Sequence, residues 1–128
     1  MIKWEIVQRL MQSFPNSFIN EKGEFIAHRA ANEYFILRDC ETELNVKCKV
    51  LEWLSRATFK TAPFVERKNK SFHSFMLNGV NLFLGTVFTP TDMEQIYTYL
   101  GNAVNHKKTM RFIESGYDMA TLGGDGDG

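Results

Sequence analysis

Two cysteines and three histidines are the side chains best suited to hold a metal ion in this chain. Cys40 and Cys48 are separated by seven residues, and His28, His73 and His106 are scattered along the sequence. Thiolate sulfur and neutral imidazole nitrogen are the usual ligands of a tetrahedral zinc ion, so Cys40, Cys48 and His73 are candidate ligands of a structural zinc. The wide cysteine spacing favours the alternative, in which Cys48 is a small core side chain and Cys40 is incidental. No cofactor is required.

The sequence patterns of common enzyme classes are missing. There is no serine in a Gly-x-Ser-x-Gly elbow, no Gly-x-x-x-x-Gly-Lys phosphate loop, and no Gly-x-Gly-x-x-Gly after a predicted strand. His73 and Ser74 are neighbours on a predicted helix, about 100° apart around its axis, and so do not face each other as a base and its nucleophile must. The sequence therefore predicts a protein that is not an enzyme.

Two groups of basic side chains are candidate partner-binding surfaces. Residues 56–70 contain five basic residues and one acidic residue, which gives a local net charge of +4. The last predicted helix carries three more basic residues. The candidate partner-binding residues are Arg56, Lys60, Arg67, Lys68, Lys70, Lys107, Lys108 and Arg111. The alternatives are an ordinary loop for the first group and, for the second, the solvated face of an αα-hairpin rather than a DNA-binding helix-turn-helix.

Apolar periodicity predicts the elements that position these residues. Helical spacing is found over residues 2–14, 42–55, 66–84, 90–100 and 106–115, and the first of these helices places Trp4, Val7, Leu10, Met11 and Phe14 on its apolar side. Strand patterns over residues 17–20, 24–28 and 33–37 surround a turn at Gly23. We expect an α+β fold with a three-stranded antiparallel sheet and about five helices, in a single domain over residues 1–122. We expect residues 123–128, rich in glycine and aspartate, to form a flexible tail.

Composition limits the kinds of partner. The 128 residues include 15 basic and 15 acidic side chains, so the formal net charge is zero. A neutral chain has neither the excess of basic residues typical of a protein that coats nucleic acid nor the excess of acidic residues typical of a DNA mimic. Any electrostatic recognition must therefore come from a local cluster of charges. No segment approaches the roughly 20 apolar residues of a membrane span, and we expect a cytoplasmic protein with reduced thiols.

Four segments of the chain resemble small proteins encoded in phages and prophages of Gram-positive bacteria. They are KVLEWLSR at residues 49–56, NLFLGT at 81–86, DMEQIYTYLGN at 92–102 and FIESGYD at 112–118. The likeness covers about residues 1–122, and the chain in particular resembles type II-A anti-CRISPR proteins.

This resemblance implies a protein that binds a type II CRISPR effector nuclease and blocks its DNA targeting or cleavage. Many such inhibitors are strongly acidic, whereas this chain is neutral, which favours capture of a recognition or nuclease lobe over DNA mimicry. Glu41, Glu43 and Glu52 or the basic segment would make the contact. Two alternatives are a phage accessory protein that binds nucleic acid through its C-terminal helix pair, and a structural zinc-binding interaction module.

Overall fold

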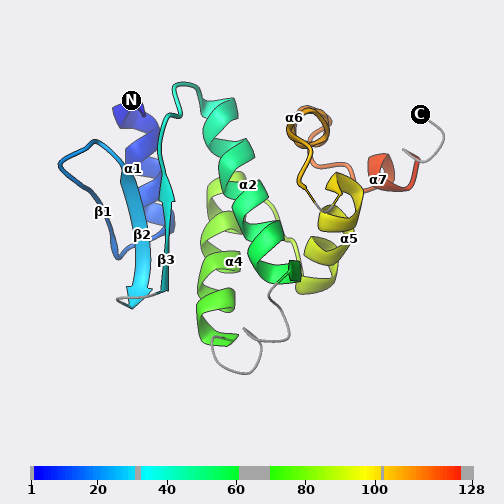
Figure 1. The fold of residues 1–128 in the computed structure, drawn as a ribbon, viewed down its shortest axis with the longest axis horizontal. Helices are drawn as coiled ribbons and strands as arrows, with labels where there is room; N and C mark the ends of the chain where they lie inside the picture. The colour runs from blue at the N-terminus through cyan, green and yellow to red at the C-terminus, as the bar shows by residue number, and fades with distance from the viewer. Residues whose placement is uncertain (1, 31–32, 61–69, 102, 125–128) are drawn as a thin grey trace.

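The structure is a computed structural model that describes residues 2–30, 33–60, 70–101 and 103–124. Three strands are followed by most of the helices, as Figure 1 shows. In chain order the elements are α1 (Trp4–Ser13), β1 (Ser17–Ile19), β2 (Phe25–Ala30), β3 (Glu33–Leu37), α2 (Glu43–Lys60), α4 (Lys70–Leu84), α5 (Pro90–Leu100), α6 (His106–Glu114) and α7 (Ala120–Gly124). The predicted α+β fold with a three-stranded antiparallel sheet is confirmed.

The sheet has the order β1-β2-β3, and each strand runs antiparallel to its neighbour. Alternate side chains point to opposite faces of the strands. Phe25, Ala27, Phe35 and Leu37 are buried and form the inner face, which packs against helices. The outer face is the opposite one, and on it Phe18 is exposed.

Phe14, at the C-terminal end of α1, joins the sheet to the helices. Its ring meets those of Phe25, Phe35 and Phe75 edge to face, with centroids 6.5, 5.5 and 6.0 Å away. Gly79 of α4 lies directly against this ring, because a Cβ atom built there would be 2.1 Å from Phe14 Cε1. Gly79 therefore marks the point where α4 lies closest to the end of α1.

Helix α2 lies between the two ends of the molecule (Figure 1). It contacts β3 and α4 on the sheet side, and α5 and α6 on the other side. Leu51 and Leu54 are fully buried along it. Helix α2 therefore contributes to the hydrophobic core both beside the sheet and beside α5 and α6.

Local signals set the start of α5 and α6. Thr89 accepts a hydrogen bond from the Asp92 amide while the Asp92 carboxylate accepts one from the Thr89 amide, and Pro90 occupies the first turn. Asn105 accepts a hydrogen bond from the Lys108 amide at the start of α6. These contacts satisfy amides that a helix N-terminus leaves unpaired, and they confirm the helix starts that the sequence predicts.

Three sequence-based expectations are corrected. Trp4 and Met11 are exposed at 61% and 37%, because the buried side of α1 is centred on Ile6 and Leu10 instead. Helix α2 continues to Lys60, so residues 56–60 are helical where a loop was expected, since the proline that would break the helix comes only at position 63. Helix α7 extends to Gly124, two residues into the predicted tail.

No helix in the described part of the chain has both the length and the apolarity needed to cross a membrane.

Candidate partner-binding surfaces

The basic residues predicted near the middle of the chain are only partly placed. Arg56 is exposed on α2, and the backbones of Lys60 and Lys70 lie at the end of α2 and the start of α4. Arg67 and Lys68, and the side chains of Lys60 and Lys70, lie outside the described residues. The described residues therefore do not show whether these five basic side chains lie close together.

The basic residues of α6 differ in their surroundings. Lys107 and Arg111 are exposed on the helix. The Lys108 ammonium instead turns back toward α5, where it donates to the Tyr99 carbonyl oxygen at 3.2 Å and lies 5.1 Å from the centre of the Tyr99 ring. Lys108 thus holds the end of α5 against α6, a role that the sequence analysis missed.

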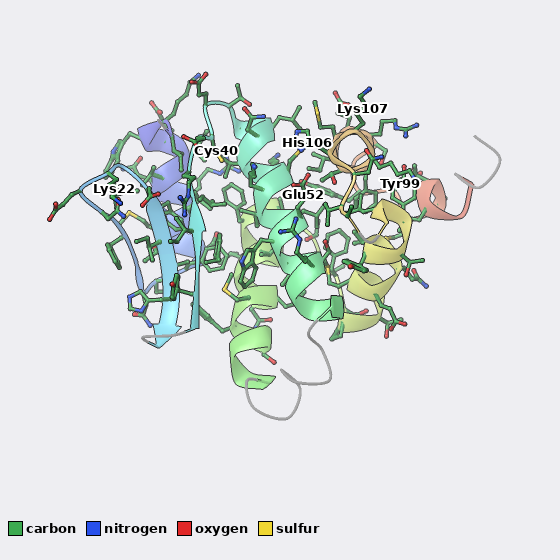
Figure 2. All side chains as sticks on the ribbon, in the orientation of Figure 1. Lys22, Cys40, Glu52, Tyr99, His106 and Lys107 are labelled. Atoms are coloured by element: carbon green, nitrogen blue, oxygen red, sulfur yellow. The ribbon has the colours of Figure 1, made fainter. Side chains whose placement is uncertain are left out.

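A buried carboxylate links α2 to α6. The Glu52 side chain is only 11% exposed, and its Oε2 atom lies 2.8 Å from His106 Nδ1. Figure 2 shows the two side chains approaching each other between the helices. Since the two residues are 54 positions apart, no local pattern could have revealed this pair. Its position leaves Glu52 poorly suited to contact a partner protein, contrary to the expectation for this residue.

Glu43 also has partners within the chain. Its carboxylate accepts a hydrogen bond from the Arg9 guanidinium of α1, and Lys47 lies 3.7 Å away. The hydrogen bond from Arg9 is the main reason why the pKa of Glu43 is lowered from its usual range. Arg9 also covers the Phe83 ring, at 4.9 Å from its centre. The group joins α1, α2 and α4, and of the three predicted acidic contact residues only Glu41 is exposed without a described ion pair.

Cys40 and Cys48 are both fully buried free thiols. Burial raises the pKa of Cys40, and it raises that of Cys48 to about 12, with the nearby Glu52 and Glu114 acting in the same direction. Cys40 Sγ donates to the Arg38 carbonyl oxygen at 3.3 Å. Both surroundings favour the thiol over the thiolate that a zinc ion requires.

The zinc site stays a prediction. In the described part of the chain, no three His, Cys, Asp or Glu side chains gather in an arrangement that could hold a metal ion. The side chain of His73 lies outside that part, although its backbone belongs to α4.

We predict that neither thiol reacts with Ellman's reagent at pH 8 in the folded protein. Burial raises the pKa of both thiols, that of Cys48 to about 12, which disfavours the reactive thiolate, and both sulfurs are shielded from the reagent. Absorbance of the released thiolate should reach two equivalents only after unfolding in urea. Cys40→Ser and Cys48→Ser variants would assign a thiol that reacted rapidly in the folded state, and such a reaction would contradict the prediction.

Exposed apolar side chains gather at one end of the molecule. In the described part of the chain seven large apolar side chains are exposed, and five of them belong to α1 or the sheet. These five are Trp4, Met11, Phe18, Ile19 and Tyr34. They divide into three groups: Trp4 and Met11 on α1, which lies on the inner side of the sheet, Ile19 beside the inner-face residue Phe25, and Phe18 and Tyr34 on the outer face. We call the first group, Trp4 and Met11, the α1 surface.

Comparisons with known proteins add no relative. The chain matches no protein-family model, and searches of curated proteins and of solved structures likewise found no match.

Proposed function

We propose that this chain is a phage-encoded inhibitor that binds a type II CRISPR effector nuclease and blocks its DNA targeting or cleavage, in the cytoplasm of the bacterial host. The nature of the partner comes from the resemblance of the four segments named above to small phage proteins. The observation that carries the binding role is the α1 surface, on which Trp4 is 61% exposed.

The α1 surface has the composition of a protein contact. Met11 follows Trp4 by seven residues, about two helical turns, so both side chains project from the same side of α1. Tryptophan is enriched among the side chains that contribute most to binding, and methionine adapts its shape to an opposing surface. The exposed Gln8 and Gln12 supply a polar border. Such a surface buries an aromatic anchor without requiring any catalytic group.

Binding of nucleic acid through α5 and α6 is less well supported. Of the three basic residues of α6, Lys108 is engaged by Tyr99, and Glu114 stands one turn from Arg111. Phosphate binding depends on the number of cations that a surface offers, and this surface is short of them.

The experiment is co-migration of the purified chain with a guide-loaded type II effector nuclease on size exclusion, followed by DNA cleavage assays. A stable complex with cleavage lost only when the chain is added before the target DNA supports an inhibitor that acts at DNA loading. If effectors of this type neither form a complex nor lose cleavage, the proposal fails.

The Trp4→Ala substitution should weaken nuclease binding by roughly 30-fold or more, the effect of losing an aromatic anchor worth about 2 kcal/mol. Because Trp4 is exposed, the free energy of unfolding should stay nearly unchanged. Calorimetry or biolayer interferometry would measure the affinity. The matched control is Gln95→Ala, which changes an exposed residue of α5 at the other end of the molecule. Equal affinities for the two variants would exclude the α1 surface from the contact.

A further inference from the structure

The outer face of the sheet is arranged in three rows across the strands. In the register of the sheet, Phe18 pairs with Ile26 and Ile26 with Ile36, so these three side chains form a central apolar row. Phe18 is 44% exposed, and Ile26 and Ile36 are partly exposed. Covering a contiguous apolar row of this kind on an open sheet face removes apolar surface from water and is therefore favourable.

A polar row lies on one side of the apolar row. Glu24 of the hairpin sits at its centre, where its carboxylate accepts a hydrogen bond from Asn20 Nδ2 at 2.8 Å and lies 3.3 Å from Arg38 Nε. The Arg38 side chain is mostly exposed whereas Glu24 is largely buried. The row carries one negative and one positive charge.

An aromatic row lies on the other side. His28 pairs with Tyr34 across β2 and β3, and the His28 ring meets the Phe18 ring edge to face at 5.6 Å. Tyr34 is 48% exposed. The two ends of the face therefore differ in chemistry: a carboxylate and a guanidinium lie at one end, and an imidazole and a phenol ring lie at the other.

We propose that this outer face docks a second copy of the chain, face to face, about a two-fold axis that runs along the apolar row. Rotation about this axis keeps each strand opposite its own counterpart and exchanges the two ends of the face. Glu24 then faces His28 of the second copy, and Arg38 faces the Tyr34 ring of the second copy, as an acid with an imidazole and a cation with an aromatic face. Phe18, Ile26 and Ile36 meet their own counterparts in the middle.

Charge selects this axis over the other in-plane one. A two-fold axis along the strands would keep the ends of the face together and bring Glu24 against Glu24 of the second copy. Like charges opposed at an interface are strongly unfavourable. Face-to-face packing with the strands nearly aligned is a common arrangement of antiparallel sheets, and a symmetric pair is the commonest oligomer.

The size of the face sets the strength of the contact. Three strands about 4.8 Å apart offer less than the roughly 800 Å² per partner of a standard interface. We therefore expect a weak, concentration-dependent dimer with a dissociation constant on the order of 10–100 μM. The inference concerns the free chain and does not depend on nuclease inhibition.

Sedimentation equilibrium of the full chain over a range of concentrations tests the proposal. Phe18 lies on the proposed axis, so Phe18→Glu and Phe18→Lys each place two like charges against each other and should weaken dimerisation at least about tenfold. An equimolar mixture of the two variants opposes unlike charges and should recover the dimer. The matched control is Trp4→Glu, an equally drastic change on α1, which should leave dimerisation intact. Circular dichroism and urea unfolding verify that each variant is folded.

Two results would overturn the proposal. The first is a wild-type chain that stays monomeric at about 1 mM, well above the expected dissociation constant. The second is a mixture of the two Phe18 variants that fails to recover the dimer, because the face would then not meet itself about this axis. If the wild-type chain is monomeric, loss of nuclease binding in both Phe18 variants would identify the nuclease as the occupant of this face instead.

Discussion

Gly79→Ala should destabilise the protein by about 2–3 kcal/mol, even though alanine favours an exposed helix over glycine by about 1 kcal/mol. The added methyl group would lie 2.1 Å from Phe14 Cε1, where no atom fits. The Phe14 ring cannot move aside cheaply, because Phe25, Phe35 and Phe75 enclose it. Urea unfolding followed by tryptophan fluorescence or circular dichroism would measure the loss.

Two variants separate overpacking from other causes. Asn78→Ala changes the adjacent exposed residue of α4 and should leave stability nearly unchanged or slightly raised. Phe14→Leu should cost less in the Gly79→Ala background than in the wild type, because the smaller side chain makes room for the methyl group. If Gly79→Ala proved as stable as Asn78→Ala, α1 and α4 would have to lie farther apart than they do here.

Asn81→Asp should destabilise the protein by about 2–3 kcal/mol at neutral pH, although it changes the side chain by a single group. The Asn81 amide nitrogen donates to the Phe88 carbonyl oxygen at 2.9 Å. Its oxygen accepts from Thr86 Oγ1 at 2.7 Å and from the Phe88 amide at 2.9 Å. A carboxylate keeps the acceptor but places a second oxygen against the Phe88 carbonyl, so a hydrogen bond is replaced by repulsion.

The matched control for this change is Asn78→Asp, which introduces the same charge one turn earlier on α4, at an exposed position. The difference in the free energy of unfolding between the two variants isolates the loop contacts from the effect of the charge itself. Equal stabilities would mean that the Asn81 side chain does not hold the segment between α4 and α5.

Features determined by neighbouring residues could be predicted from the sequence. The start of α5 is an example, because Thr89, Pro90 and Asp92 act within one turn. Gly85, directly after α4, has a φ of 73°, the left-handed conformation that glycine commonly adopts at the C-terminal end of a helix. The three strands were likewise expected close to where they lie, since alternation and the turn at Gly23 are both local.

Features determined by tertiary packing could not be predicted from the sequence. Trp4 and Met11 fit the apolar periodicity of α1, yet they are exposed, because the position of the neighbouring sheet and helices decides which part of a wide apolar stripe is covered. The Glu52–His106 pair joins residues far apart in the sequence, and Lys108 turns toward Tyr99 rather than outward. Partner-binding surfaces are the hardest features to predict from the sequence, because they consist of exposed side chains and packing decides which side chains are exposed.

The central position of α2 has a consequence for how the protein unfolds. Both the sheet end and the α5–α6 end complete their cores against this one helix. Neither end has a full apolar core of its own, so a chain cut within α2 would leave two fragments that each expose one side of it. We therefore expect the molecule to unfold as a single cooperative unit, in which loosening either end lowers the free energy of unfolding of the other.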